Sequence, residues 1–183
     1  MVASAAEAFR PLRRVEYDHL VALGVFANER VELLDGALVA MSPIGAPHNA
    51  AVQKLTRLLI LVLEGRAAVR CQMSFAALEL SVPEPDFTIV PVGEYETDHP
   101  DQAYLVIEVS ESSLAYDRGR KAVLYASCAV PEYWVVNTLE RCIEVYTAPQ
   151  GRTYAQVQKY EPGQAIRLVA FDGVSIAVSD VFK

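Results

Sequence analysis

Two carboxylates in the middle of the chain lie within apolar segments, where burying a charged group is unfavourable. Asp86 opens the apolar run FTIV, and Glu108 lies near the end of the apolar run AYLVIEV. Burying a carboxylate among apolar side chains is expensive unless the group is paired or holds a metal ion. We therefore expect both side chains to lie at a strand end or in a cleft, each with a partner.

The spacing of the two acids allows them to face each other. If residues 86–90 and 104–108 form neighbouring antiparallel strands, Asp86 lies opposite Glu108. Directly opposed side chains point to the same face of a sheet, with Cβ atoms about 5 Å apart. Two carboxylates at that distance repel each other, and a divalent cation between them would keep both ionised. Oxygen ligands favour Mg²⁺ or Mn²⁺ over zinc.

A lysine follows at Lys121, with Asp117 one helical turn before it. An ammonium group near a metal-bound water can position that water, lower its pKa, or stabilise charge on a phosphate. A second interpretation is an ordinary ion pair between Asp117 and Lys121 on a helix surface, worth roughly 0.3–0.5 kcal/mol. Spacing alone leaves both interpretations open, and it also allows Glu108 to pair with an arginine and Asp86 to cap a turn.

The elements around these residues predict a mixed sheet flanked by helices. Helical patterns cover residues 15–23, 48–64 and 114–127, the last capped by Ser112 or Ser113. A hairpin is expected around Asp35-Gly36. β-prone segments cover residues 67–71, 75–80, 86–91, 103–109, 132–136, 142–147, 153–160, 165–170 and 174–178. The pattern indicates one α/β (α+β) domain over residues 1–183 with a strand-rich C-terminal portion and a flexible segment over residues 1–14.

The composition of the chain argues against several classes of protein. The longest uncharged apolar run, residues 58–63, is far shorter than the roughly 20 residues of a membrane span. The three cysteines form no metal-binding or disulfide pattern, and the N-terminal order of residues is not that of a secretory signal, so we expect a cytoplasmic protein. The net charge of −7 counts against strong binding to nucleic acid, which depends on Lys and Arg neutralising phosphates.

Four separated motifs resemble the Uma-two family of restriction endonucleases, within the PD-(D/E)xK nuclease superfamily. They are VELLDGALVAMSPIGAPH, the pair PD at 85–86, LVIEVSESSLAYDRGRKAVLYA and VPEYWVV, in order from Val31 to Val136. A weaker similarity continues to a point near Phe182. The resemblance implies a restriction-endonuclease-like core, a mixed β-sheet flanked by helices with an acidic pair at one edge.

The resemblance also implies a set of metal ligands. In that superfamily the Asp of PD and the Glu of the next strand bind the metal, which corresponds to Asp86 and Glu108. The carbonyl of Val109 would be a further ligand. An acidic residue from an earlier element often joins the site, and Glu32 is the matching candidate.

The catalytic lysine departs from the parent pattern. The lysine of the ExK motif would fall at position 110, where this chain has Ser110, whereas the Uma-two pattern places a lysine on the following helix, matching Lys121. His48 and Asp117 are possible accessory residues. The resemblance implies Mg²⁺- or Mn²⁺-dependent hydrolysis of phosphodiester bonds in nucleic acid, with DNA as the expected substrate and a homodimer as the expected assembly.

Two other classes of function remain open from the sequence. A non-catalytic dimeric interaction or DNA-binding module on the same fold is favoured by the absent ExK lysine and by the acidic net charge. A small-molecule enzyme or binding protein on a strand-rich α/β sheet would require the motifs to be coincidental. A nuclease site requires the carboxylates of Asp86 and Glu108 and the amine of Lys121 to converge on one cleft.

Overall fold

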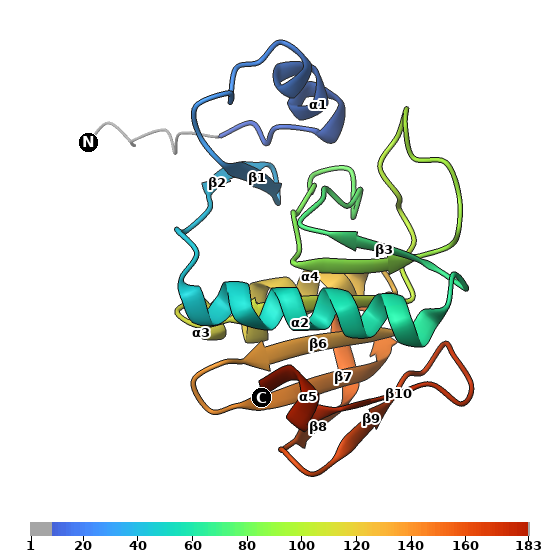
Figure 1. Ribbon diagram of the computed structural model, residues 1–183. Coiled ribbons are helices and arrows are strands. Elements are labelled where there is room, and N and C mark those ends of the chain that lie inside the picture. Colours follow the sequence, from blue (N-terminus) through green and yellow to red (C-terminus); the bar gives the residue numbers. More distant parts are fainter. Residues whose placement is uncertain (1–8, 183) are drawn as a thin grey trace.

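A six-stranded mixed sheet forms the centre of the computed structural model, which describes residues 9–182 of the chain (Figure 1). The strand order is β3-β4-β5-β6-β7-β8. These strands are β3 (Ala68–Cys71), β4 (Phe87–Val90), β5 (Leu105–Ser110), β6 (Glu132–Asn137), β7 (Cys142–Gln150) and β8 (Thr153–Tyr160). Within this sheet β5 and β6 are parallel, and the other neighbouring strands are antiparallel. A parallel pair needs a crossover connection, and the helical segment between β5 and β6 provides it.

The register between β4 and β5 is the one expected from the sequence. Phe87 pairs with Ile107 and Ile89 with Leu105 in an antiparallel ladder. Continuing this register by one residue places Asp86 opposite Glu108. The predicted antiparallel pairing of the two acidic segments is therefore confirmed.

Helices cover both faces of the sheet. Figure 1 shows α2 (Ala46–Leu63) across the near face and α4 (Ala122–Ser127) behind the sheet. The near face also carries α5 (Val178–Phe182) and the hairpin of β9 (Ala165–Arg167) and β10 (Ser175–Ala177). On the far face, α4 continues a segment that begins with α3 (Leu114–Tyr116) and the π-helical turn η1 (Asp117–Lys121).

The central strands are buried on both sides, as expected for a covered sheet. Every residue of β4, β5 and β6 is buried. Alternate side chains enter opposite cores, so that Trp134 packs with Leu59 of α2, while its neighbour Tyr133 packs with Tyr125 of α4. This double burial makes any charged side chain near the sheet depend on polar partners.

A small hairpin and an N-terminal helix lie above the sheet in Figure 1. They are α1 (Arg14–Ala22), β1 (Val31–Leu34) and β2 (Ala37–Ala40). Asp35 and Gly36 both have positive φ, 50° and 77°, which the predicted two-residue turn requires. Within the segment expected to be flexible, the Leu12 N–H donates to the Gly36 carbonyl at 2.9 Å. The first eight residues of that segment lie outside the described ones.

The structure differs from the predicted elements in four places. The helix α2 begins two residues earlier than expected, because Pro47 fits the first turn, where its missing N–H needs no partner. The β-prone segment 75–80 forms only an isolated bridge, between Leu78 and Ser81. The helix expected over residues 114–127 contains the π-helical turn η1, and α5 was not expected. Among residues 9–182, no helix is both long and apolar enough to span a membrane.

The turn at Gly36 generates a stability prediction. A Cβ atom on Gly36 would lie 2.3 Å from the Cβ of Pro11, whereas one on Gly173, with nearly the same φ, would meet no atom within 4 Å. Both glycine-to-alanine substitutions impose left-handed strain of about 1–2 kcal/mol. We expect Gly36→Ala to lower the free energy of unfolding by at least about 1 kcal/mol more than Gly173→Ala, measured by urea denaturation. Equal losses would contradict the packing of the N-terminal segment on this turn.

Candidate active site

The two acids and the lysine converge on one pocket of about 330 Å³. The Lys121 ammonium lies 3.3 Å from Glu108 Oε1 and 2.6 Å from Glu32 Oε2. All the candidate residues from the sequence line this pocket, namely Glu32, His48, Asp86, Glu108, Val109, Asp117 and Lys121. The convergence required of a nuclease site is therefore present in the structure.

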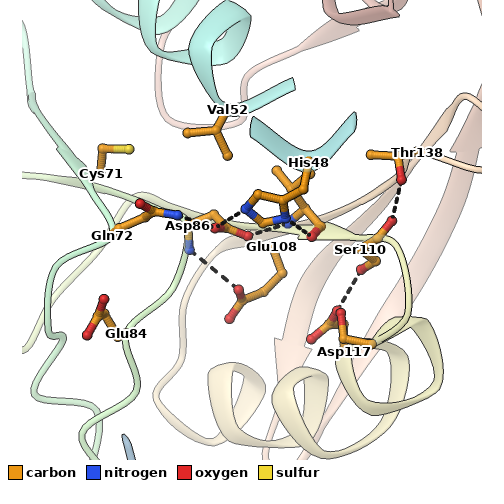
Figure 2. A network of polar contacts seen from close by, with 12 residues as sticks. His48, Val52, Cys71, Gln72, Glu84, Asp86, Glu108, Ser110, Asp117 and Thr138 are labelled. Carbon is orange, nitrogen blue, oxygen red and sulfur yellow. Dashed lines mark hydrogen bonds and ion pairs between the residues drawn. The ribbon is translucent and has the colours of Figure 1, made fainter. Parts of the chain in front are cut away.

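Asp86 lies directly before β4, and its carboxylate is fixed from several sides (Figure 2). Its Oδ2 accepts the N–H of Val109 at 2.8 Å, and its Oδ1 accepts the Gln72 amide at 3.3 Å. The same Oδ1 lies 3.0 Å from Nε2 of His48. A carboxylate offers about four lone-pair positions, so these contacts leave room for a further ligand.

His48, in the first turn of α2, bridges two of the proposed metal ligands. Its Nδ1 lies 2.9 Å from the carbonyl oxygen of Val109. Its Nε2 faces Asp86 (Figure 2). Both partners are acceptors, so the doubly protonated imidazolium suits this position best. Burial is the largest single influence and lowers the pKa of His48, but the Asp86 carboxylate and the Val109 carbonyl together raise it above the ordinary value.

The ionised form of Glu108 is the most strongly disfavoured in the pocket. The Tyr125 hydroxyl donates to its Oε1 at 2.6 Å, and the Asp86 N–H donates to its Oε2 at 3.4 Å. Burial raises the pKa of Glu108 to about 8, although the nearby Lys121 ammonium lowers it. The charge of one lysine therefore does not balance the carboxylates that surround it, and a further cation would favour the ionised form.

Lys121 is a buried residue and not part of a helix-surface ion pair. Lys121 is 5% exposed and Asp117 is 4% exposed. Lys121 pairs with Glu32 and Glu108, and those carboxylates raise its pKa even though burial, the largest single influence, lowers it. The interpretation of Asp117 and Lys121 as a surface pair is therefore wrong, because both side chains turn into the protein.

Ser110 occupies the position of the ExK lysine and takes part in a different contact. Its hydroxyl donates to Asp117 Oδ2 at 2.6 Å (Figure 2). The Ser113 hydroxyl donates to the same atom at 2.6 Å. Burial raises the pKa of Asp117, and these two hydrogen bonds oppose that effect. The strand thus supplies a hydroxyl that holds Asp117, while the ammonium comes from the helix.

The π-helical turn η1 accounts for the position of the lysine. Such turns insert a residue into an α-helix and often occur at functional sites. Here the turn ends at Lys121, and Tyr125 follows one turn later, so that both side chains reach the same oxygen of Glu108. Ion pairs hold the turn from outside, with Arg118 bound to Glu144 and with Arg120 Nε 3.1 Å from Asp35 Oδ2.

Two residues of the site were not identified from the sequence. Tyr125 follows Lys121 by four residues on a helix, so a search for polar groups on the inward face could have found it. Gln72 stands in a loop with a left-handed φ of 51°, and no local pattern indicates that its amide reaches Asp86.

The donor set fits a hard divalent cation. Asp86 and Glu108 offer carboxylate oxygens and Val109 a carbonyl oxygen, which are the ligands that Mg²⁺ and Mn²⁺ prefer. A carbonyl oxygen has two lone pairs, so its contact with His48 does not prevent a second interaction. Over residues 9–182, no group of three or more His, Cys, Asp or Glu side chains is arranged to hold a metal ion.

Comparison with known proteins identifies a family and a similar fold. The model of the Uma2 family, described as "Putative restriction endonuclease", matches residues 15–179. A solved structure with a similar fold is that of "a putative nuclease belonging to DUF820 from Anabaena variabilis ATCC 29413". Its TM-score is 0.73 at 15% identity, over 94% of this chain and 98% of that chain. This likeness shows the fold, and the predicted restriction-endonuclease-like sheet is confirmed. No curated protein matches the chain.

Removing the buried ammonium is expected to destabilise the protein. Lys121→Met removes the ammonium partner of the buried Glu32 and Glu108 side chains. Where both carboxyls are ionised, breaking such a buried pair costs about 3–5 kcal/mol. The raised pKa of Glu108 means that the folded form keeps its proton up to about pH 8, whereas the unfolded chain loses it near 4.5, so stability falls as pH rises between these values. Because the Lys121 ammonium lowers the pKa of Glu108, this pKa rises further in Lys121→Met, and the stability of the variant continues to fall above pH 8. The loss relative to the parent should therefore be larger at pH 9 than at pH 6.

The measurement is urea unfolding of both proteins in EDTA across this pH range. Lys159→Met is the matched control, because Lys159 forms an exposed ion pair with Glu140. This control should leave the free energy of unfolding nearly unchanged. A Lys121→Met protein as stable as the parent at pH 9 would contradict the buried pairing.

Proposed function

Because this chain belongs to the Uma2 family of restriction endonucleases, we propose that it hydrolyses phosphodiester bonds in DNA with Mg²⁺ or Mn²⁺ held at a PD-(D/E)xK-type site. Family membership supports a nuclease. The observation that carries the finer proposal is the convergence of Asp86, Glu108 and the buried Lys121 on one pocket. An ion pair with a purely structural role would need neither a second carboxylate, from a neighbouring strand, nor an adjacent pocket.

Asp86, Glu108 and the carbonyl of Val109 would hold the cation. When bound, such a cation lowers the pKa of a coordinated water and offsets charge on the phosphate. Glu108 gains most from this partner, because its buried carboxyl otherwise keeps a proton up to about pH 8. Asp86 is held for the role by the Val109 N–H and the Gln72 amide.

Lys121 has the chemistry to act on the phosphate or on the attacking water. An ammonium group has three N–H donors, and Glu32 and Glu108 accept two of them. The third remains for a phosphate oxygen or for the water. Because the raised pKa of Lys121 keeps it charged, its role here is electrostatic stabilisation and positioning, with no transfer of its proton.

His48 and Asp117 act through their neighbours. The His48 imidazole fixes the distance between the Asp86 carboxylate and the Val109 carbonyl by contacting both. Asp117 binds the hydroxyls of Ser110 and Ser113 and so ties the end of β5 to the start of the helical segment. Both residues are therefore positioning residues in this proposal.

A homodimer is also proposed, since paired copies could address both DNA strands, and light scattering after gel filtration would test it.

The activity test is cleavage of DNA in Mg²⁺ and, separately, in Mn²⁺. Asp86→Ala and Glu108→Ala should each lower the cleavage rate by more than about a hundredfold, because even the residues that support metal ligands are worth 10–100-fold. Glu140→Ala is the matched control, since this carboxylate is exposed and pairs with Lys159. If either site variant cuts as fast as the parent protein, the site assignment is wrong.

Metal binding can be measured without turnover. Mg²⁺ should raise the melting temperature of the parent protein, because a ligand that binds only the folded state stabilises it, by about 2.7 kcal/mol at a concentration one hundred times its Kd. Asp86→Asn should abolish this shift and Glu140→Gln should retain it, with NaCl at matched ionic strength as the reference. Equal shifts in all three proteins would place the cation elsewhere.

A further inference from the structure

The acids of the site lie at the bottom of a pocket. Asp86 is 8% exposed and Glu108 is 7% exposed, inside a pocket of about 330 Å³. That volume is at the lower end of the range for small-ligand sites. DNA in an intact duplex is stiff, with a persistence length of about 50 nm, and each of its phosphates is flanked by the rest of the double helix. A flexible single strand can enter such a pocket far more easily than a duplex.

Apolar side chains form part of the lining of this pocket. Hydrophobic residues from β2, the following loop and α3 line the same pocket as the acids, namely Val39, Met41, Pro43, Ile44 and Tyr116. We call these five residues the apolar rim. Met41 and Ile44 are half-buried, so part of each side chain is open to a ligand. The loop is anchored at both ends, by the Met41 N–H on the Arg30 carbonyl and by the start of α2 at Gly45.

The charges around the pocket do not suit a long duplex. Six carboxylates line it, those of Glu32, Glu84, Asp86, Glu108, Glu111 and Asp117, against the two permanent cations Arg30 and Lys121. Both cations are already paired, Arg30 with Glu84 and Lys121 with Glu32. Duplex binders commonly neutralise 6–10 phosphates with Lys and Arg. Affinity here must come largely from the bound metal and from contacts that are not electrostatic.

We propose that the substrate is an unpaired DNA strand, such as a single strand, flap or gap, whose base contacts the apolar rim while its phosphodiester enters the pocket. The proposal rests on the proposed function and names the substrate class of that same site. Contacts between an unpaired base and apolar or aromatic side chains need no basic surface, and each can change affinity tenfold or more. A base inside a duplex is stacked and paired, so the rim cannot reach its face.

Binding can be measured without cleavage by using Ca²⁺ in place of Mg²⁺. The probes are a fluorescent 20-nucleotide strand, the same sequence as a blunt duplex, and a duplex with a single-stranded flap. We expect the single strand and the flap to bind at least about tenfold more tightly than the blunt duplex by fluorescence anisotropy. Equal or tighter binding of the blunt duplex, or no binding of any probe, overturns the proposal.

The rim itself is tested by the double substitution Met41→Ala and Ile44→Ala. We expect the Kd for the single strand to rise about tenfold, with little change for the blunt duplex. Leu139→Ala is the matched control, because Leu139 is a large apolar residue, 70% exposed, on the β6–β7 turn and outside the pocket. An unchanged Kd in the rim variant, with an unchanged melting temperature, overturns the assignment of the rim.

Cleavage of the same three probes in Mg²⁺ separates this proposal from the proposed function. Cleavage that requires Asp86 but prefers the blunt duplex overturns the substrate class and supports the nuclease. If no probe is cleaved but the single strand still binds in a rim-dependent way, the proposed catalytic activity is wrong and the proposed class of DNA ligand is supported. Cleavage of the single strand and the flap that is lost in Asp86→Ala supports both.

Discussion

The ammonium of Lys121, buried between Glu32 and Glu108, is the interaction on which the site depends. It joins three parts of the chain that are far apart in sequence: the β1–β2 hairpin, the central strand β5 and the helical segment that follows it. A buried charge left without a partner costs several kcal/mol, so these three elements are held in one arrangement. The same arrangement forms the floor of the pocket.

The buried carboxyl of Glu108 at the floor of the pocket lowers the stability of the folded protein. Burial raises the pKa of Glu108 to about 8, so that its ionised form is disfavoured at neutral pH despite Lys121. A protein whose only requirement was stability could replace such a group by an apolar side chain of similar size. In the proposed function, the bound cation would supply the second positive charge that favours the ionised form of Glu108. Stability and the proposed chemistry therefore oppose each other at this residue.

The structure around Lys121 shows how the site is arranged without a lysine at the ExK position. Ser110 is small enough to be fully buried at the end of β5, where it holds Asp117 through a hydrogen bond. The π-helical turn ends at Lys121, and Lys121 and Tyr125 both contact Glu108. The ammonium beside Glu108 therefore comes from the helical segment, and the strand residue at the ExK position only holds Asp117.

The sequence by itself predicted the β-prone segments and the flanking helices, because apolar periodicity is a local property. The pairing of Asp86 with Glu108 was a hypothesis from spacing, and the register of β4 and β5 in the structure confirmed it. The sequence also provided Glu32 and Lys121 as candidates, both supported by family motifs, and His48 as a possible accessory residue from its position at the start of the long helix. Only the tertiary structure decided that Asp117 and Lys121 are buried and have different partners, and that Gln72 and Tyr125 join the site. Those facts depend on contacts between distant segments, whose energies no local pattern records.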